Sequence, residues 1–436
     1  MLSRRDVIGV LTTGSLLDTL RTTGTDASKR CIDEDWVQYG YDPANTAFAP
    51  GNTGPEKPID SRWTFDEFSR IGAAPSVGNG IVLVTGRGGE VRALSARDGS
   101  ERWRTTAGGD WSSPAVHGNT VYVGSVFGDY GVTALSAQTG SERWRAGTDR
   151  PVKSSPTVAD DTVYVGDYDD HEESGTIYAF DAIEGTERWR VDGIGITRSA
   201  LAVADDTIFA AGRRSVHALS QKDGTEQWRT EVGDATWLAP AVSDGTVFVG
   251  TETGRIVAIS ADDGTIRWGS RPCAEILTSP AVDESTVYIG GTEGTVSALS
   301  TSTGESQWSV GLSTQNIQSL AVVDGTVYAP SILGSVYALS STTGAVQWKY
   351  DTGASIQSST SIADETVYVG NHDGELFALC NGDRDGVFGL GLTDDLLPIG
   401  VGAGIAGLVV GTMYKLYKEV TGNQSENDDT DRHQTR

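Results

Sequence analysis

The densest group of side chains that could bind a metal ion is an acidic run at residues 167–173, Asp-Tyr-Asp-Asp-His-Glu-Glu. Carboxylate oxygens are the ligands that Ca²⁺ prefers in proteins. The run lies in the one lengthened unit of a repeating pattern, and a charged insertion at such a place is typical of a solvated loop. We therefore interpret it as a loop and predict no metal site there.

A second acidic segment begins like a calcium-binding loop, with Asn-Gly-Asp-Arg-Asp-Gly at residues 381–386. Position 12 of such a loop needs a bidentate Glu, and Leu392 stands there, so the segment is interpreted as a linker. The histidines do not have a spacing typical of a metal site: His117, His171, His217, His372 and His433. The three cysteines, Cys31, Cys273 and Cys380, are too few and too scattered for a disulfide framework. No local motif marks a Ser–His–Asp arrangement. The sequence predicts no catalytic centre, no cofactor and no metal.

The positions of the tryptophans indicate which elements carry any site. Eight of them recur at intervals of 39 to 45 residues: Trp63, Trp103, Trp144, Trp189, Trp228, Trp268, Trp308 and Trp348. A period near 40 residues with strand-rich units is typical of a β-propeller, in which each unit buries its faces against its neighbours.

Each repeat contains four short apolar runs separated by turn residues, and the tryptophan lies on the fourth. Turns such as Asp244-Gly245 are strong hairpin signals. The first Trp run precedes every complete set, and the last set, which ends at Leu379, lacks one. Residues 61–66 therefore supply the fourth strand of the last blade and leave no open edge. The predicted fold is an all-β, eight-bladed propeller of four-stranded antiparallel blades.

The loops between the fourth strand of one blade and the first strand of the next hold the least repeated residues. Aligned two residues before a recurrent Ser or Ala position, they carry Gly72, Trp111, Lys153, Thr197, Trp237, Leu277, Ile317 and Gln357, with Arg198 adjacent. If this ring faces the central funnel, its aromatic and basic groups suit an anionic or planar ligand, or a partner segment anchored by aromatic contacts. We take Trp111, Lys153, Arg198, Trp237 and Gln357 as the candidate binding face. The alternative is that these residues only pack over the channel mouth.

The chain is strongly acidic, with 33 basic and 59 acidic residues and a net charge of −26. The acids are spread over all the repeats, which indicates a surface adapted to high salt, as in halophilic archaea. The alternative interpretation is that the negative charge creates an electrostatic field that attracts cationic partners. No basic stripe is present, which argues against nucleic-acid binding.

Both ends of the chain carry targeting signals. Arg4-Arg5 before a short apolar stretch is typical of a twin-arginine export signal. Residues 396–414 are uncharged and long enough to span a bilayer, and Lys415 and Lys418 follow them. The predicted order is export signal region 1–30, lead-in 31–60, propeller 61–382, acidic linker 383–395, transmembrane helix 396–414 and cytoplasmic tail 415–436, with the propeller outside the cell.

The repeat motif Ala-Leu-Ser-Ala-Gln-Thr-Gly-Ser-Glu-Arg-Trp at residues 134–144 resembles the repeats of the pyrroloquinoline-quinone (PQQ) β-propeller superfamily. The lead-in, with Trp36 and Asp-Pro-Ala-Asn-Thr at 42–46, resembles the segment that precedes such propellers. The resemblance implies that each repeat tryptophan docks one blade on the next. Trp36 lies outside the repeat, and we expect it to contribute less to stability.

The superfamily contains quinoprotein dehydrogenases and also non-catalytic propellers, including the BamB-like outer-membrane assembly propellers. The dehydrogenases have a disulfide of adjacent cysteines and Glu, Asn and Asp ligands for calcium, which have no match in this chain. The resemblance therefore implies a membrane-anchored scaffold that binds a protein or small ligand. A quinoprotein oxidoreductase that uses PQQ with calcium is the first alternative, and a ligand-sensing ectodomain is the second.

Overall fold

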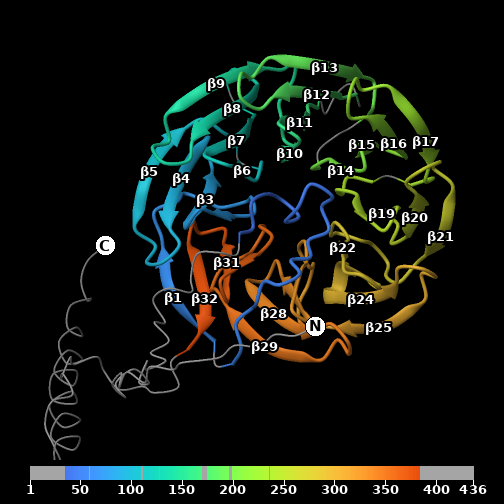
Figure 1. Cartoon of the computed structure of the whole chain (residues 1–436). Helices are drawn as coiled ribbons and strands as arrows, with labels where there is room; N and C mark the ends of the chain where they lie inside the picture. The colour runs from blue at the N-terminus through green and yellow to red at the C-terminus, as the bar shows by residue number, and fades with distance from the viewer. Residues whose placement is uncertain are drawn as a thin grey trace, which may run out of the picture. The chain divides into compact units, whose positions relative to one another are not determined.

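The computed structural model describes residues 35–57, 59–109, 111–126, 128–168, 174–195, 199–234 and 236–382. In this part of the chain, 32 strands form eight four-stranded sheets, each of them antiparallel, arranged as blades around a central axis (Figure 1). The predicted fold is confirmed. In each blade we name the strands A to D from the axis outward.

The first four blades, each in the order A to D, contain β2 (Ser76–Gly78), β3 (Ile81–Gly86), β4 (Glu90–Ser95) and β5 (Glu101–Thr106); β6 (Ala115–His117), β7 (Thr120–Ser125), β8 (Gly131–Ser136) and β9 (Glu142–Gly147); β10 (Thr157–Ala159), β11 (Thr162–Gly166), β12 (Thr176–Asp181) and β13 (Glu187–Asp192); and β14 (Ala202–Ala204), β15 (Thr207–Ala211), β16 (Ser215–Ser220) and β17 (Glu226–Glu231). The other four contain β18 (Ala241–Ser243), β19 (Thr246–Gly250), β20 (Ile256–Ser260) and β21 (Ile266–Ser270); β22 (Ala281–Val282), β23 (Thr286–Gly290), β24 (Thr295–Ser300) and β25 (Ser306–Gly311); β26 (Ala321–Val323), β27 (Thr326–Pro330), β28 (Ser335–Ser340) and β29 (Val346–Asp351); and β30 (Ser361–Ala363), β31 (Thr366–Gly370), β32 (Leu376–Asn381) and β1 (Ile59–Phe65). A short 3₁₀ turn, η2 (Thr292–Gly294), lies between β23 and β24.

Burial follows the position of a strand in its blade. The B strand β11 is buried along its whole length, because both of its faces pack against neighbouring blades. The D strand β13 instead alternates exposed and half-buried residues, since its outer edge faces solvent. The apolar runs of strands A to C thus form the core between blades, and the polar D strands form the rim.

The N-terminal strand closes the ring, as the repeat predicts. β1 pairs antiparallel with β32, and Trp63 lies opposite Ala378. In the other blades, a C–D turn receives the tryptophan of the preceding blade. The last blade has no such turn, and the indole Nε1 of Trp348 donates instead to the carbonyl of Pro55 at 3.1 Å. The segment before β1 therefore supplies both the missing strand and the missing docking partner.

The lead-in does more than precede the propeller, because it bonds to the A strand of every blade. Seven A strands donate a backbone N–H to it over 2.7–3.1 Å: Val77 to Trp36, Val116 to Val37, Val158 to the side chain of Gln38, Val203 to Pro43, Val242 to Ala44, Val282 to Thr46 and Val322 to Ala47. In the eighth blade, Asn52 Nδ2 donates to the carbonyl of Ile362 at 3.0 Å. The blue segment in Figure 1 crosses the middle of the ring on this path.

Trp36 is part of this central structure. Its side chain is only 2% exposed, and its ring lies 5.2 Å from that of Tyr41. Its backbone exchanges two hydrogen bonds with Val77, both 2.8 Å long. This deep burial argues against the expectation that Trp36 contributes less than the repeat tryptophans, because an irregular segment can be as deeply buried as a repeat when it fills the axis. The contribution of Trp36 to stability stays a prediction.

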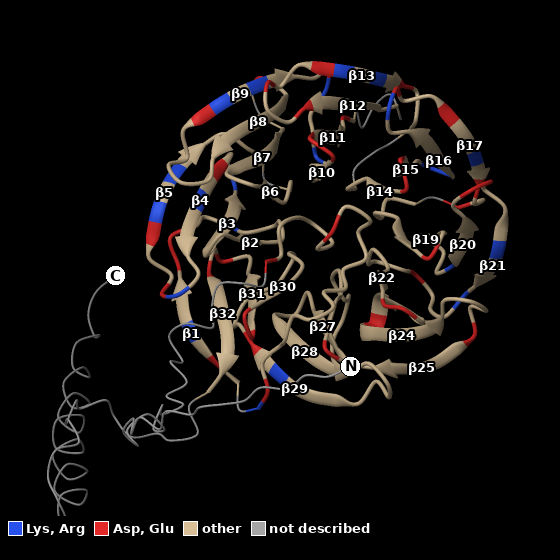
Figure 2. Cartoon of the chain, in the orientation of Figure 1, with Lys and Arg blue, Asp and Glu red and all other residues tan. Residues whose placement is uncertain are grey.

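Charged residues are distributed over the whole propeller. Figure 2 shows Asp and Glu on all sides of the ring, and Lys and Arg on the outermost strands as well as in loops. The D strands contain the recurrent arginines, such as Arg104 in β5 and Arg190 in β13. The adaptation of this acidic surface to high salt stays a prediction.

Among the residues described, no helix has the length and apolarity needed to cross a membrane. The predicted export signal region 1–30, acidic linker 383–395, transmembrane helix 396–414 and cytoplasmic tail 415–436 lie outside the described ranges.

Candidate binding funnel

The loops that join strand D of one blade to strand A of the next surround a cavity of about 190 Å³ on the axis. We call this cavity the funnel. Trp111, Lys153, Trp237 and Gln357 all line it, so the structure brings together four of the five residues predicted for the binding face. The fifth, Arg198, lies outside the described residues.

Two described members of the predicted ring, Leu277 in the sixth blade and Ile317 in the seventh, do not line the funnel, and in the seventh blade the alignment itself fails. Ile317 is fully buried there and bridges Ser331, while the next residue, Gln318, lines the funnel. The loop before the seventh blade, residues 312–320, is as long as those before the fifth and eighth blades, 232–240 and 352–360, so the shift by one residue leaves no trace in the spacing of the sequence. Thr197, at the same position of another blade, lies outside the described part.

Arg70, which the sequence analysis missed, contacts two of the residues that line the funnel. Its guanidinium carbon lies 4.6 Å from the centre of the Trp111 ring, and its Nη2 donates to Gln357 Oε1 at 2.6 Å. Arg70 thereby links side chains from two different loops. In the sequence, Arg70 is visible only as an arginine four residues before Ala74. That spacing does not show that its side chain extends to Trp111 and Gln357.

A second cation lies beside another aromatic ring at the same opening. Lys153 Nζ is 5.0 Å from the centre of the Tyr168 ring. Trp111 is 45% exposed, which is unusual for so large an apolar side chain. Among the described residues that line the funnel there is no Asp or Glu, although the chain contains 59 of them. The funnel therefore combines exposed aromatic surface with positive charge.

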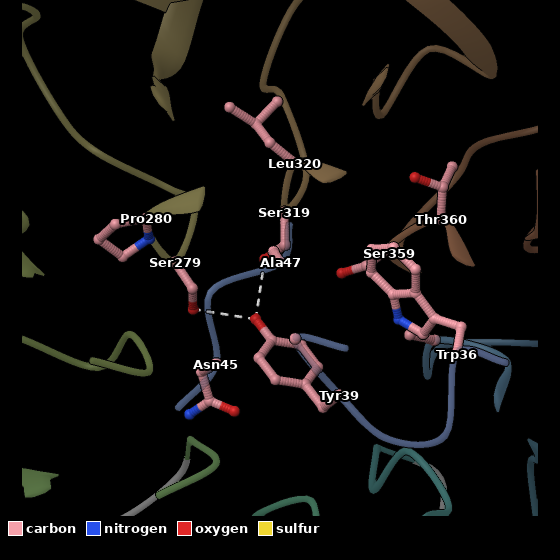
Figure 3. A pocket seen from close by; sticks show the side chains of 12 residues that line it. Trp36, Tyr39, Asn45, Ala47, Ser279, Pro280, Ser319, Leu320, Ser359 and Thr360 are labelled. Atoms are coloured by element: carbon pink, nitrogen blue, oxygen red, sulfur yellow. Dashed lines mark hydrogen bonds between the residues drawn. The ribbon is translucent and has the colours of Figure 1, made fainter. Parts of the chain in front are cut away.

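The lead-in forms the floor of the funnel. Tyr39 lines the cavity, and its hydroxyl lies 2.9 Å from Ser279 Oγ and 3.0 Å from Ser319 Oγ (Figure 3). Below it, Trp36, Asn45 and Ala47 help to enclose only about 10 Å³, which is room for about one water molecule. The axis is thus closed beneath the funnel.

The recurrent serine of the loops links neighbouring blades around this floor. Its side chain accepts a hydrogen bond from the backbone of the preceding blade: Ala74 N donates to Ser113 Oγ at 3.0 Å, Ser113 N to Ser155 Oγ at 3.0 Å, and Ala239 N to Ser279 Oγ at 2.9 Å. These bonds tie neighbouring blades together around the opening. The repeated Ser is therefore structural, and the variable residues beside it face the cavity.

Each repeat tryptophan contacts the next blade in one common geometry. The indole Nε1 donates over 2.7–3.1 Å to a backbone carbonyl of that blade: Trp63 to Ala96, Trp103 to Ala137, Trp144 to Ala182, Trp189 to Gln221, Trp228 to Ala261, Trp268 to Thr301, Trp308 to Ser341 and Trp348 to Pro55. The register of strands C and D shifts by one residue next to each of these tryptophans, as between Ala179 and Phe180 opposite Trp189, which is typical of a β-bulge. The energetic role of these contacts stays a prediction.

In the acidic run at residues 167–173, the structure describes one carboxylate, that of Asp167. Asp167 is fully buried, and it accepts hydrogen bonds from Thr176 N at 2.8 Å and from the Tyr178 hydroxyl at 3.0 Å. Burial raises the pKa of this carboxyl. Residues 169–173 lie outside the described ranges. Within those ranges, no three His, Cys, Asp or Glu residues are grouped so that they could hold a metal ion.

Comparison with known proteins supports this architecture. The family model described as outer membrane protein assembly factor BamB matches the chain in four overlapping stretches, residues 60–167, 87–212, 173–280 and 269–384. No curated protein sequence matches significantly.

Solved structures of both catalytic and non-catalytic propellers are similar to this one. BamB from Moraxella catarrhalis has a TM-score of 0.61 and 18% identity, over 75% of this chain and 99% of that one. The quinohemoprotein alcohol dehydrogenase from Comamonas testosteroni has a TM-score of 0.69 and 15% identity, over 87% of this chain and 84% of that one. The quinohemoprotein alcohol dehydrogenase ADHIIG from Pseudomonas putida HK5 has a TM-score of 0.68 and 15% identity, over 88% of this chain and 85% of that one. At these identities the likeness shows the fold alone.

Proposed function

The chain belongs to the family of the outer membrane protein assembly factor BamB, and from that premise we propose that its propeller is a scaffold that binds a segment of a partner protein in the funnel. BamB is, by its name, a factor in protein assembly. In this proposal the propeller has no catalytic centre of its own, and Trp111 and Trp237 are the anchors for the partner.

The observation that carries the proposal is the size and lining of the funnel. Its volume of about 190 Å³ is below the roughly 300 Å³ at which pockets for small molecules begin. That volume suits one or two side chains of a partner segment. Exposed tryptophan and arginine side chains are also the residues that most often dominate protein–protein binding energy. The stacked pair of Arg70 and Trp111 presents both at once.

The second candidate function is a PQQ-dependent oxidoreductase, favoured by the two dehydrogenases of similar fold. The described residues of the funnel do not fit a quinone with calcium. Calcium takes oxygen ligands, usually with carboxylates among them, and no described Asp or Glu lines the cavity. Tyr39 and the lead-in also fill the axis beneath it. We therefore favour the scaffold.

The test is the double variant Trp111→Ala with Trp237→Ala. We expect it to unfold at the temperature of the parent protein and to lose most of the crosslinks that the parent forms with its partner in native membranes. Ile183→Ala is the matched control, because Ile183 is an apolar side chain that is 76% exposed and does not line the funnel. Equal loss of folding and crosslinking would show that the two tryptophans are structural. Retention of both would refute the funnel as the binding site.

A separate measurement decides between the two candidate functions. Addition of PQQ and Ca²⁺ to the purified parent protein should give no stoichiometric quinone absorbance after gel filtration. Binding of one PQQ per chain, with dye reduction in the presence of an alcohol, would favour the oxidoreductase.

The proposal includes a location, the outer face of the cell membrane, with residues 396–414 as the anchor and 415–436 as a cytoplasmic tail. Removal of residues 396–436 should release the propeller into the medium. Arg4→Lys with Arg5→Lys should retain the chain inside the cell. Recovery of full-length protein in the medium would contradict the anchor.

A further inference from the structure

Arg70 and Gln357 meet at the funnel from two neighbouring loops. Gln357 lies in the loop that joins β29 to β30 and lines the funnel, and Arg70 lies in the next loop around the ring, which joins β1 to β2. We call these two residues the Arg70–Gln357 pair, because Arg70 Nη2 donates to Gln357 Oε1 at 2.6 Å. Trp111, which the guanidinium of Arg70 covers, belongs to the third loop in this order.

The backbone at Arg70 is held by hydrogen bonds on both sides. The carbonyl of Arg70 accepts from Arg87 N, and Ile71 N donates to the carbonyl of Asn371, both at 3.2 Å. The Ile71 side chain is fully buried. An anchored backbone reduces the conformational entropy that the Arg70 side chain loses when it binds a ligand.

Arg70 has no carboxylate partner within the part of the chain that the structure describes. Its side-chain contacts there are those with Gln357 and Trp111. The buried arginine of β4 is different, because Arg92 pairs with three carboxylates over 2.6–2.9 Å, those of Glu67, Glu90 and Glu101. A guanidinium that lies over an indole ring keeps N–H groups at its planar edge, and this edge matches the two oxygens of a carboxylate. Arg70 can therefore take a carboxylate from another molecule.

The bond to Arg70 also fixes the orientation of the Gln357 amide. A guanidinium only donates, so the atom of Gln357 that faces it is the acceptor Oε1. The remaining hydrogen-bonding group of the amide is then the donor Nε2, which makes no hydrogen bond to any residue that the structure describes. The Arg70–Gln357 pair thus offers donors from both of its side chains, and the acceptor between them is already used.

The local charge of the funnel is opposite to that of the whole chain. The chain has a net charge of −26, and a field of that sign attracts cations. Lys153 lines the funnel, Arg70 lies beside it, and no Asp or Glu is found among the described lining residues. A ligand that binds in the funnel through charge is therefore anionic.

We propose that the partner segment inserts an Asp or Glu side chain into the funnel, where the Arg70–Gln357 pair binds the carboxylate and an adjacent apolar side chain lies against Trp111. The inference rests on the proposed function and adds the chemistry of the segment. An acidic side chain next to an apolar one satisfies the donors of the pair and covers the exposed indole surface at the same time.

The direct test measures binding of two peptides of equal shape to the full chain by saturation-transfer NMR at pH 7. The probes are N-acetyl-Leu-Glu N-methylamide and N-acetyl-Leu-Gln N-methylamide, which differ by one charge. The Glu probe should bind roughly three-fold more tightly or better, the size expected for one partly screened ion pair. General attraction to a chain of charge −26 predicts the opposite order, so this preference has to come from a local cationic site.

Two variants assign the preference to the Arg70–Gln357 pair. Arg70→Gln removes the cation. Gln357→Glu keeps an acceptor for Arg70 Nη2 and therefore the link between the loops, but it neutralises the guanidinium from within the chain and repels a carboxylate. In both variants the Glu probe should bind no more tightly than the Gln probe. The affinity ratio refers to the folded protein, so a change in stability does not affect it.

The matched control is Arg102→Gln, which makes the same change of charge at an exposed residue of β5 that does not line the funnel. It should leave the ratio of the two affinities unchanged. A ratio that falls as far in Arg102→Gln as in Arg70→Gln would show that the net charge and not the pair sets the preference, and the proposal would fail.

The double variant Trp111→Ala with Trp237→Ala separates this proposal from the proposed function. Equal binding of both probes to the parent, with loss of both in the double variant, would overturn the acidic segment and leave the funnel as the binding site. Full binding of both probes to the double variant would overturn the funnel as well. If neither probe binds the parent at millimolar concentration, the acidic segment is also refuted, and the crosslinks in native membranes still decide the scaffold function.

Discussion

The indole ring of Trp228 packs so closely on Gly264, the C–D turn glycine of the following blade, that the glycine has no room for a side chain. A Cβ on Gly264 would lie 2.7 Å from Cδ2 of the indole, and the residue has a φ of +72°. The same indole donates a 2.8 Å hydrogen bond to Ala261, three residues before the glycine. One side chain thus joins two blades by packing and by a directed bond.

Trp228→Ala should destabilise the propeller by about 3 kcal/mol, the lower end of the range for emptied aromatic sites, because part of the indole is exposed. Chemical denaturation monitored by circular dichroism measures this difference. Trp111→Ala is the control, since Trp111 lies at the surface and should cost little. Equal stability of the Trp228 variant and the parent would contradict the docking role.

Gly264→Ala separates packing from backbone strain when it is compared with Gly245→Ala. Both glycines have positive φ, +72° and +63°, so an alanine at either suffers about 1–2 kcal/mol of strain. Only at Gly264 would the new Cβ meet an indole ring, because the nearest atom at Gly245 is 4.0 Å away. We expect Gly264→Ala to lower the free energy of unfolding more than Gly245→Ala does. Equal effects would show that the indole moves aside without cost.

The ring of blades could be predicted from the sequence because its physical requirements repeat. Each blade needs a tryptophan and a turn glycine at the same places, so eight copies make the signal visible, and the unmatched strand at Trp63 indicates the closure. The position of four residues of the candidate binding face around the funnel was predictable for a related reason. Side chains that depart from the repeat, such as Trp111, stand out against it.

The lead-in and Arg70 left weaker signals. The lead-in bonds to the A strands mainly through backbone groups, and backbone groups carry no residue preference that a sequence shows. Arg70 acts through the reach of a single side chain, which meets Trp111 and Gln357 only in the folded ring. The register of Ile317 changes without any change in loop length.

The lead-in should contribute to stability independently of ring closure. A chain that starts at Ile59 keeps β1 and loses the bonds to the A strands, whereas one that starts at Gly72 loses both. We expect the first to be a monomer with a lowered unfolding temperature. The second should aggregate, because the edge of β32 is then unpaired. Gel filtration and thermal unfolding distinguish the two. A monomeric chain from Gly72 with full stability would refute the closure by β1.

Asp42 should make the stability of the protein depend on pH. Its carboxylate accepts hydrogen bonds from Thr46 N at 2.9 Å and Thr46 Oγ1 at 2.6 Å, but burial dominates and raises the pKa of Asp42 above its ordinary value of 3.8. Between 3.8 and the raised pKa the native protein binds more protons than the unfolded chain, so this group lowers stability as pH rises. Asp42→Asn removes the buried charge. The stability of this variant relative to the parent should therefore increase as pH rises from about 3.5 and level off above the raised pKa.

Asp351→Asn is the control of opposite sign. The hydrogen bond from Ser335 and the contact with Lys349 lower the pKa of Asp351, so its carboxylate stabilises the native protein above pH 3.8 and loses that effect as pH falls through the lowered pKa. The Asp351 variant should thus be less stable than the parent at neutral pH and approach it in acid. Thermal unfolding of all three proteins from pH 3.5 to 7 measures both differences. Parallel curves for the parent and Asp42→Asn would show that Asp42 is not the titrating group, because removal of a buried carboxylate with a raised pKa must change the slope.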